Sequence, residues 1–122
     1  HVVANPLDID DLWSRATALV CPLRWGAGSR IKILEAAASG VPVVATRFSV
    51  EGLELEEGTD FLAGEEPSEL AASVISLMRE VAAADSLALR ARKGVERNHS
   101  WAVMQPRMTE LYESLVDHRR KR

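Results

Sequence analysis

The segment from Pro22 to Thr46, PLRWGAGSRIKILEAAASGVPVVAT, constrains the fold of this chain more than any other part of the sequence. It contains a strand end, a glycine loop, an alanine-rich run, a second glycine and a continuous apolar run. This order predicts a helix over 30–39 that Gly40 ends, followed by a strand over 41–45 that is buried on both faces. An apolar run over 17–21 precedes the segment and predicts a first strand. Strand, helix and strand in this order form a parallel crossover unit.

The rest of the chain predicts shorter elements around this unit. Before it, we expect a weak strand over 1–4 and a helix over 9–15 with Asp8 as its N-cap. After it, we expect an acidic loop over 47–60 and a short edge strand over 61–63.

Three further helices are predicted after the edge strand. The first starts at Pro67 and extends past Val81, the second covers 87–96 after a break over 83–86, and the last follows Ser100 as its cap. Apolar side chains at helical spacing are expected to be buried. In the helices over 9–15, from Pro67 and after Ser100 these are Ile9, Leu12, Trp13, Leu70, Val74, Leu77, Met78, Val81, Trp101, Met104, Met108, Leu111, Tyr112 and Leu115. The helix over 87–96 has the partly periodic apolar residues Leu87, Leu89, Ala91 and Val95.

Composition limits the classes of protein to consider. A length of 122 residues predicts one domain over 1–122, and 47% apolar residues are ordinary for a globular protein. The net charge of −3 argues against a nucleic-acid partner. The lone Cys21 fits a reducing compartment, and no apolar run reaches the roughly 20 residues that span a bilayer. We therefore expect a cytoplasmic protein, and a fragment of a longer chain, because the sequence does not begin with Met.

The glycine loop carries the features of an anion site. Gly26 and Gly28 precede the predicted helix, whose first N–H groups and partial positive charge attract anions, and Ser29 is placed to cap it. Arg30 and Lys32 oppose the helix dipole there, at a cost of roughly 0.3–1 kcal/mol each. This placement makes sense when an anionic ligand lies at that end. The alternative, that both are solvated surface cations, stays open.

Glu35 is the one carboxylate of this apolar, alanine-rich helix. A carboxylate accepts hydrogen bonds from both hydroxyls of a ribose, and the small residues 36–38 allow a ligand to approach closely. A solvent-facing Glu35 that pairs weakly with Lys32 is the alternative. Arg24 adds a third cation to the loop. The histidines lack metal-ligand spacing, and the glycines match neither a Rossmann fingerprint nor a Walker A loop.

The segment from Pro22 to Thr46, followed by Val50-Glu51-Gly52-Leu53, resembles the C-terminal domain of GT-B glycosyltransferases of the retaining group 1, or family 4, type. Together with the Asn98-x-Ser100-Trp101 junction, the resemblance covers the chain from about Leu7 to Leu115. It implies an α/β fold that is a partial Rossmann-like three-layer α/β/α arrangement with a small parallel sheet of about three to four strands. The chain would be the C-terminal half of the second GT-B domain and N-terminally incomplete.

The resemblance also implies an activity. The parent protein would be a hexosyltransferase that transfers a sugar, with retention, from a nucleotide-diphosphate-sugar to the hydroxyl of a carbohydrate or lipid-linked acceptor, in polysaccharide biosynthesis of the cell envelope. Glu35 matches the glutamate that binds ribose hydroxyls, the backbone of 28–30 faces the phosphates and sugar, and Arg30 and Lys32 neighbour the phosphates. The donor is a substrate, so no cofactor and no metal is expected, and the catalytic residues are unassigned.

Two departures from the family pattern leave alternatives open. Ala27 stands where the family has a first glutamate, eight residues before Glu35, and the facing domain with the acceptor site is missing, so the fragment alone is expected to be inactive. A non-catalytic nucleotide-sugar-binding module and a nucleotide-sugar 2-epimerase-like domain are the alternatives. An exposed sheet edge predicts a homodimer. The basic tail over 118–122 is either a peripheral contact with lipid at the inner face of the membrane or a solvated terminus.

Overall fold

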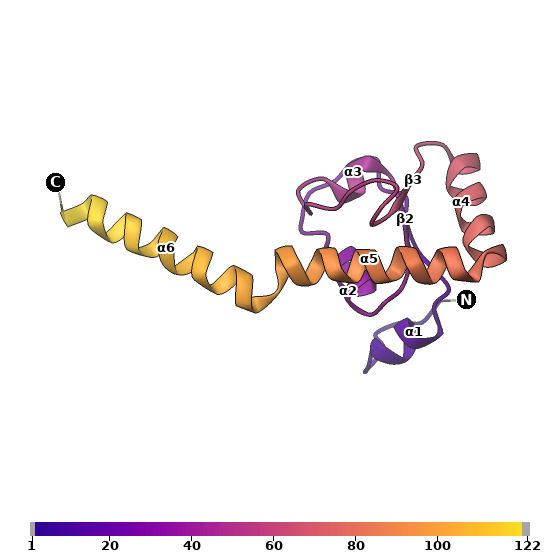
Figure 1. Ribbon diagram of the computed structural model, residues 1–122, viewed down its shortest axis with the longest axis horizontal. Coiled ribbons are helices and arrows are strands. Elements are labelled where there is room, and N and C mark those ends of the chain that lie inside the picture. Colours follow the sequence, from indigo (N-terminus) through magenta and orange to yellow (C-terminus); the bar gives the residue numbers. More distant parts are fainter. Residues whose placement is uncertain (1, 121–122) are drawn as a thin grey trace.

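A computed structural model describes residues 2–120 as a three-stranded parallel sheet with helices on both faces and one helix that extends away from the body (Figure 1). The strand order is β1-β2-β3, and both pairings are parallel. This confirms the predicted α/β class and the small parallel sheet of a partial Rossmann-like fold. In chain order the elements are α1 (Asp10–Arg15), β1 (Leu19–Cys21), α2 (Ile31–Ala38), β2 (Val43–Ala45), α3 (Arg47–Val50), β3 (Leu62–Ala63), α4 (Pro67–Arg79), α5 (Val81–His99) and α6 (Trp101–Arg120).

The predicted crossover unit is present as β1, α2 and β2. At the end of α2, the N–H of Gly40 donates to the carbonyl of Ala37 at 3.1 Å, and the N–H of Val41 donates to Ala36 at 2.8 Å. These two bonds form a Schellman motif, and Gly40 has the positive φ of 75° that the motif requires. The chain then enters β2, whose three residues are all fully buried, as the sequence predicted.

Alternate residues of β2 face two core clusters on opposite sides of the sheet. Val43 and Ala45 pack with α2 and with the C-terminal half of α5, whereas Val44 packs with α4 and the first turns of α5. The sheet is therefore the middle of three layers, with α2 on one face and α4 on the other. α5 is long enough to contribute to both clusters, and it passes in front of α2 in Figure 1.

α4 begins at Pro67, as predicted, and Glu69 stabilises its first turn. The carboxylate of Glu69 accepts hydrogen bonds from the N–H groups of Glu66 at 3.1 Å and of Glu65 at 2.8 Å. These two bonds, the Glu66 bond first, hold the pKa of the Glu69 carboxyl below its usual value. The side chain thus fixes the turn that leads from β3 into α4.

Some predicted boundaries were wrong. Residues 2–4 form no strand, and His1 lies outside the described residues. The predicted break over 83–86 is absent because α5 is continuous from Val81, and the chain turns at Glu80 instead. Alanine has the highest helix propensity, and Ala84 packs in the core, so this stretch continues the helix. The acidic loop contains the unpredicted four-residue helix α3, for which Thr46 provides the cap.

Several side chains expected in the core are exposed. In the early helices Ile9, Met78 and Val81 face solvent, although Leu70 and Leu77 are buried as predicted. Met78 follows Leu77 directly, so it points about 100° away from the buried face of α4. Helical spacing alone did not separate the edge of the apolar face from its centre.

The largest error concerns α6. The helix starts at Trp101 and contains Pro106, as expected, but it extends away from the domain (Figure 1). Trp101 is 71% exposed and Tyr112 is 63% exposed. Met104 is half-buried, and the other apolar residues of the predicted face are exposed. Periodicity predicts a helix from local spacing, whereas burial also needs a surface to pack against. No helix within residues 2–120 is both long and apolar enough to cross a membrane.

Candidate functional site

Three connections meet at the carboxyl edge of the sheet, which is the edge where open α/β sheets bind ligands. The loop over 22–30 follows β1, α3 follows β2, and residues 64–66 follow β3. Backbone bonds tie these connections to the neighbouring strands. The N–H of Thr46 donates to Cys21 at 3.2 Å, and the N–H of Gly64 donates to Ala45 at 3.1 Å. The six residues predicted to bind the donor lie on this loop and on α2, which starts from it.

The glycine loop presents its backbone to open space. Gly26 and Gly28 have φ values of 126° and 113°, a region that favours glycine. A Cβ added at either position would meet no atom within 4 Å, so backbone conformation rather than crowding requires glycine there. Ala27 and Ser29 are also exposed. A ligand can therefore reach the loop backbone from the solvent side.

Ser29 does not cap α2, which corrects the sequence prediction. The helix begins at Ile31, so the cap position falls on Arg30, which makes no side-chain cap bond. Ser29 lies one position too early to reach the first turn. Consequently no side chain of residues 2–120 caps the first N–H groups of α2, and an uncapped helix N-terminus attracts anions.

Arg30 lies between this helix end and α3. Its Nη1 donates to the carbonyl of Gly28 at 2.5 Å, and its guanidinium carbon is 5.0 Å from the centroid of the Phe48 ring. The Nε atom is buried and has no hydrogen-bond partner among the described residues. No carboxylate within residues 2–120 forms an ion pair with Arg30. Its charge is therefore uncompensated by the described chain.

The other arginines of this edge are paired with acids. Arg24 donates to the carbonyl of Glu65 at 2.8 Å and lies 3.6 Å from the carboxylate of Glu66. Arg47 forms ion pairs with Glu57 at 2.7 Å and with Glu65 at 3.4 Å. The hydrogen bonds that Arg47 donates to the Glu57 carboxylate, and then the negative charge of that carboxylate, raise the pKa of Arg47. The cations that the sequence grouped in the loop thus differ: Arg24 is engaged, whereas Arg30 is not.

Lys32 and Glu35 both lie on the exposed side of α2. They form no ion pair with each other, although they are one turn apart, and neither pairs with another charge within residues 2–120. The neighbouring Ala36 and Ala37 are buried, so they hold this helix closely against the sheet. The Glu35 carboxylate is therefore accessible, one turn behind the helix start where Arg30 lies.

Two residues that the sequence analysis did not single out anchor the start of the glycine loop. Thr46 and Ser49 are buried, and the Thr46 hydroxyl donates to the carbonyl of Leu23. The Ser49 hydroxyl donates to Cys21 at 2.8 Å and accepts from the N–H of Leu23 at 3.1 Å. The Thr46 hydroxyl also accepts from the N–H of Ser49 at 3.2 Å, which is an N-cap bond. In the sequence, the Thr46-x-x-Ser49 spacing was the signal that could have indicated this helix cap.

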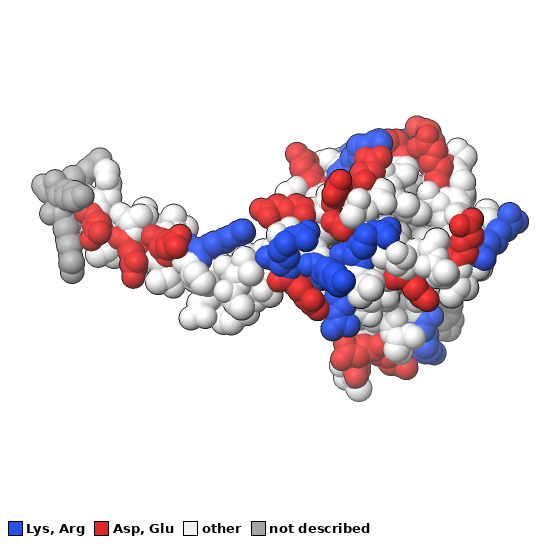
Figure 2. Space-filling view, in the orientation of Figure 1, with Lys and Arg blue, Asp and Glu red and all other residues white. Residues whose placement is uncertain are grey.

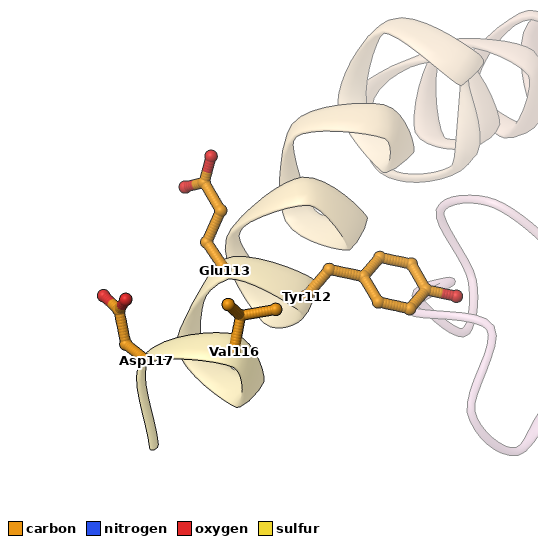
Figure 3. Close-up of a pocket in the computed structure, with 4 residues that line it drawn as sticks. All are labelled: Tyr112, Glu113, Val116 and Asp117. Carbon is orange, nitrogen blue, oxygen red and sulfur yellow. The ribbon is translucent and has the colours of Figure 1, made fainter. Parts of the chain in front are cut away.

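Other hollows of the surface lack the features of a site. A hollow on α6 is lined by Tyr112, Glu113, Val116 and Asp117, and Figure 3 shows the Tyr112 ring pointing away from both carboxylates. Basic side chains gather over α5 in Figure 2, where Arg90, Lys93 and Arg97 line a hollow together with Glu56 and Asp60. Its two acids offset two of its three cations. In residues 2–120, no cluster of three His, Cys, Asp or Glu side chains is arranged to hold a metal ion.

Comparison with known proteins identifies the family of the chain. The family model described as "Glycosyl transferases group 1" matches residues 1–80, which is more than half of the chain. The chain belongs to the group 1 glycosyltransferase family. Searches of curated proteins and of solved structures found no significant match.

Proposed function

We propose that this chain is the donor-binding domain of a retaining glycosyltransferase that transfers a hexose from a nucleotide-diphosphate-sugar to an acceptor hydroxyl. The observation that carries the proposal is the uncompensated Arg30 beside two positive-φ glycines at the uncapped start of α2. A dianionic diphosphate supplies the negative charge that this arrangement lacks.

In this proposal each site residue has a separate role. The backbone at Gly26 and Gly28 allows the diphosphate to approach the N–H groups of α2, and Arg30 donates to its oxygens. Lys32 adds charge to the same end of the helix. Such fixed donors stabilise the negative charge that develops on the leaving nucleoside diphosphate. Neither a cofactor nor a metal is part of the proposal.

Glu35 is proposed to bind the ribose of the donor. Its carboxylate is exposed and has no ion-pair partner within residues 2–120, so its acceptor sites are available for two hydroxyls. It lies on the same helix as the phosphate site, about one turn further along. This places the ribose contact behind the diphosphate contact along one side of α2.

The test is direct binding of UDP, GDP, ADP and dTDP to the intact protein, measured by calorimetry. Binding of at least one diphosphate is expected. Glu35→Gln should weaken it about five- to thirtyfold, since a hydrogen bond to a charged group contributes about 1–2 kcal/mol more than one to a neutral group. Glu113→Gln, the same change at an exposed position of α6, is the control and should leave affinity unchanged. Equal affinity of the Glu35→Gln variant would remove Glu35 from the site.

A non-catalytic nucleotide-sugar-binding module is the second candidate. It is favoured by Ala27, an exposed alanine at the loop position where the family pattern has a carboxylate. The two candidates differ in product: the enzyme transfers the sugar to an acceptor, whereas the module only binds the donor. An assay that measures whether the intact protein transfers radiolabelled sugar to an acceptor decides between them.

Further partners belong to the same proposal. We propose a carbohydrate or lipid-linked acceptor. We also propose a cytoplasmic location, with peripheral contact at the inner face of the membrane through the basic tail over 118–122. Residues 121–122 of this tail lie outside the described residues. A homodimer through the outer edge of β1 is proposed because β1 pairs only with β2 among the described strands. A monomer mass that does not change with concentration in light scattering would contradict the dimer.

A further inference from the structure

Two residues of α3 and its cap residue contact the two ends of the glycine loop. Ser49, with the cap residue Thr46, holds the start of the loop through bonds to Cys21 and Leu23. Phe48 lies against the other end, with the guanidinium carbon of Arg30 5.0 Å from its ring centroid. This distance is within the roughly 6 Å over which a cation is attracted to an aromatic ring.

This contact with an aromatic ring differs from the way in which the other arginines of this edge are held. Arg47, on the same helix, is fixed by the carboxylates of Glu57 and Glu65, which neutralise its charge and occupy its donors. An aromatic ring fixes the plane of a guanidinium without accepting its in-plane hydrogen bonds. Arg30 therefore keeps its charge and, apart from the Nη1 bond to Gly28, its terminal donors.

The burial of Arg30 adds a second constraint. Its Nε atom is buried and has no hydrogen-bond partner within residues 2–120, so the side chain is partly desolvated without a compensating bond. A residue that served only the fold would be expected to satisfy that donor. The arrangement instead holds the end of the guanidinium towards the glycine loop.

We propose that Phe48 is a positioning residue that orients the Arg30 guanidinium for the diphosphate of the donor. This inference rests on the proposed function, because it assigns the ligand of Arg30. Phe48 does not touch the ligand in this account; it acts through Arg30. Loss of the ring should therefore affect recognition of phosphate and leave recognition of the nucleoside unchanged.

The experiment compares Phe48→Leu, Phe48→Tyr, Arg30→Gln and the double variant Phe48→Leu/Arg30→Gln with the unsubstituted protein. For each, dissociation constants are measured by NMR titration for the best-binding nucleoside diphosphate among UDP, GDP, ADP and dTDP, and for its parent nucleoside. Phe61→Leu is the matched control because it makes the same change in the core, where Phe61 is 3% exposed.

Phe48→Leu should weaken diphosphate binding about three- to tenfold, the range expected from the loss of one cation–π contact. Phe48→Tyr should retain affinity because it keeps the ring. The double variant should bind no more weakly than Arg30→Gln, since both changes remove the same contact. Nucleoside binding should not change in any of these variants. Phe61→Leu should lower the midpoint of thermal unfolding without altering the ratio of diphosphate to nucleoside affinity.

Three results would overturn the inference while leaving the donor site in place: unchanged diphosphate binding in Phe48→Leu, equal weakening of nucleoside binding, or additive effects in the double variant. Absence of diphosphate binding by the unsubstituted, folded protein would overturn the proposed function and this inference together.

Discussion

Replacement of Ser49 by alanine should lower the free energy of unfolding by about 1.5–4 kcal/mol. The Ser49 hydroxyl is fully buried, donates to the carbonyl of Cys21 and accepts from the N–H of Leu23. The Cys21 carbonyl keeps a second donor, the N–H of Thr46 at 3.2 Å, so its loss is partial. The N–H of the half-buried Leu23 loses the acceptor that Ser49 provides, and a donor left unsatisfied in the interior costs about 1–3 kcal/mol. The lost bond to Cys21 adds about 0.5–1 kcal/mol.

Urea unfolding monitored by circular dichroism measures this change, provided that the m-value stays constant. Ser76→Ala is the matched control, because Ser76 is exposed on α4 and its replacement should change stability by less than about 0.5 kcal/mol. Hydrogen exchange gives a local readout, since the Leu23 amide should lose protection before the amides of β2. A loss of less than about 0.5 kcal/mol in Ser49→Ala would refute the role of this hydroxyl as an anchor of the loop.

Three further predictions concern the scaffold. Gly40→Ala should lower the free energy of unfolding by about 1 kcal/mol, since alanine is strained at the positive φ of the α2 stop, and Gly40→Asn should cost less; equal unfolding midpoints for both would contradict this. Glu69→Gln should destabilise the protein at neutral pH. Because folding lowers the pKa of this carboxyl, its contribution is present above its unfolded pKa and is lost as pH falls through the folded value, so the two unfolding curves should converge in acid. Ile33→Val should cost about 0.5–1.5 kcal/mol and Ile33→Ala about 2–5 kcal/mol in chemical denaturation, because the side chain is fully buried between α2 and the sheet, and a smaller loss for alanine than for valine would exclude this packing.

Local sequence signals predicted the centre of the fold well. The Gly40 stop and the apolar run after it predicted the end of α2 and a strand buried on both faces, and both are present. These features are encoded within a few residues, by a backbone conformation that glycine favours and by a continuous apolar run. Edge strand β3 was predicted from its short apolar run, and the start of α4 from Pro67, because proline favours the first turn of a helix.

The failures lie where the outcome depends on distant contacts. Ser29 was expected to cap α2, but the helix starts one residue later than predicted, after Arg30, whose guanidinium lies over the ring of Phe48 in α3. α3 itself was missed because four residues carry too little periodicity to predict a helix. The apolar side of α6 was expected in the core, yet Trp101 and Tyr112 are exposed.

For the candidate site, the sequence alone determined which residues are available and their approximate order along the chain. Gly26, Gly28 and Glu35 were identified because glycines before a helix and a carboxylate in an apolar helix are unusual local patterns. Whether they bind a nucleotide-sugar stays a prediction. Only the tertiary structure showed that the cations have different partners. Arg24 pairs with Glu66 from the loop after β3, whereas Arg30 contacts the ring of Phe48 and pairs with no carboxylate within residues 2–120. The physical reason is that Coulomb energy and hydrogen bonding depend on distance in space. Arg24 and Glu66 are 42 residues apart in the chain, and Arg30 and Phe48 are 18 apart, so the parallel sheet is what brings each pair together.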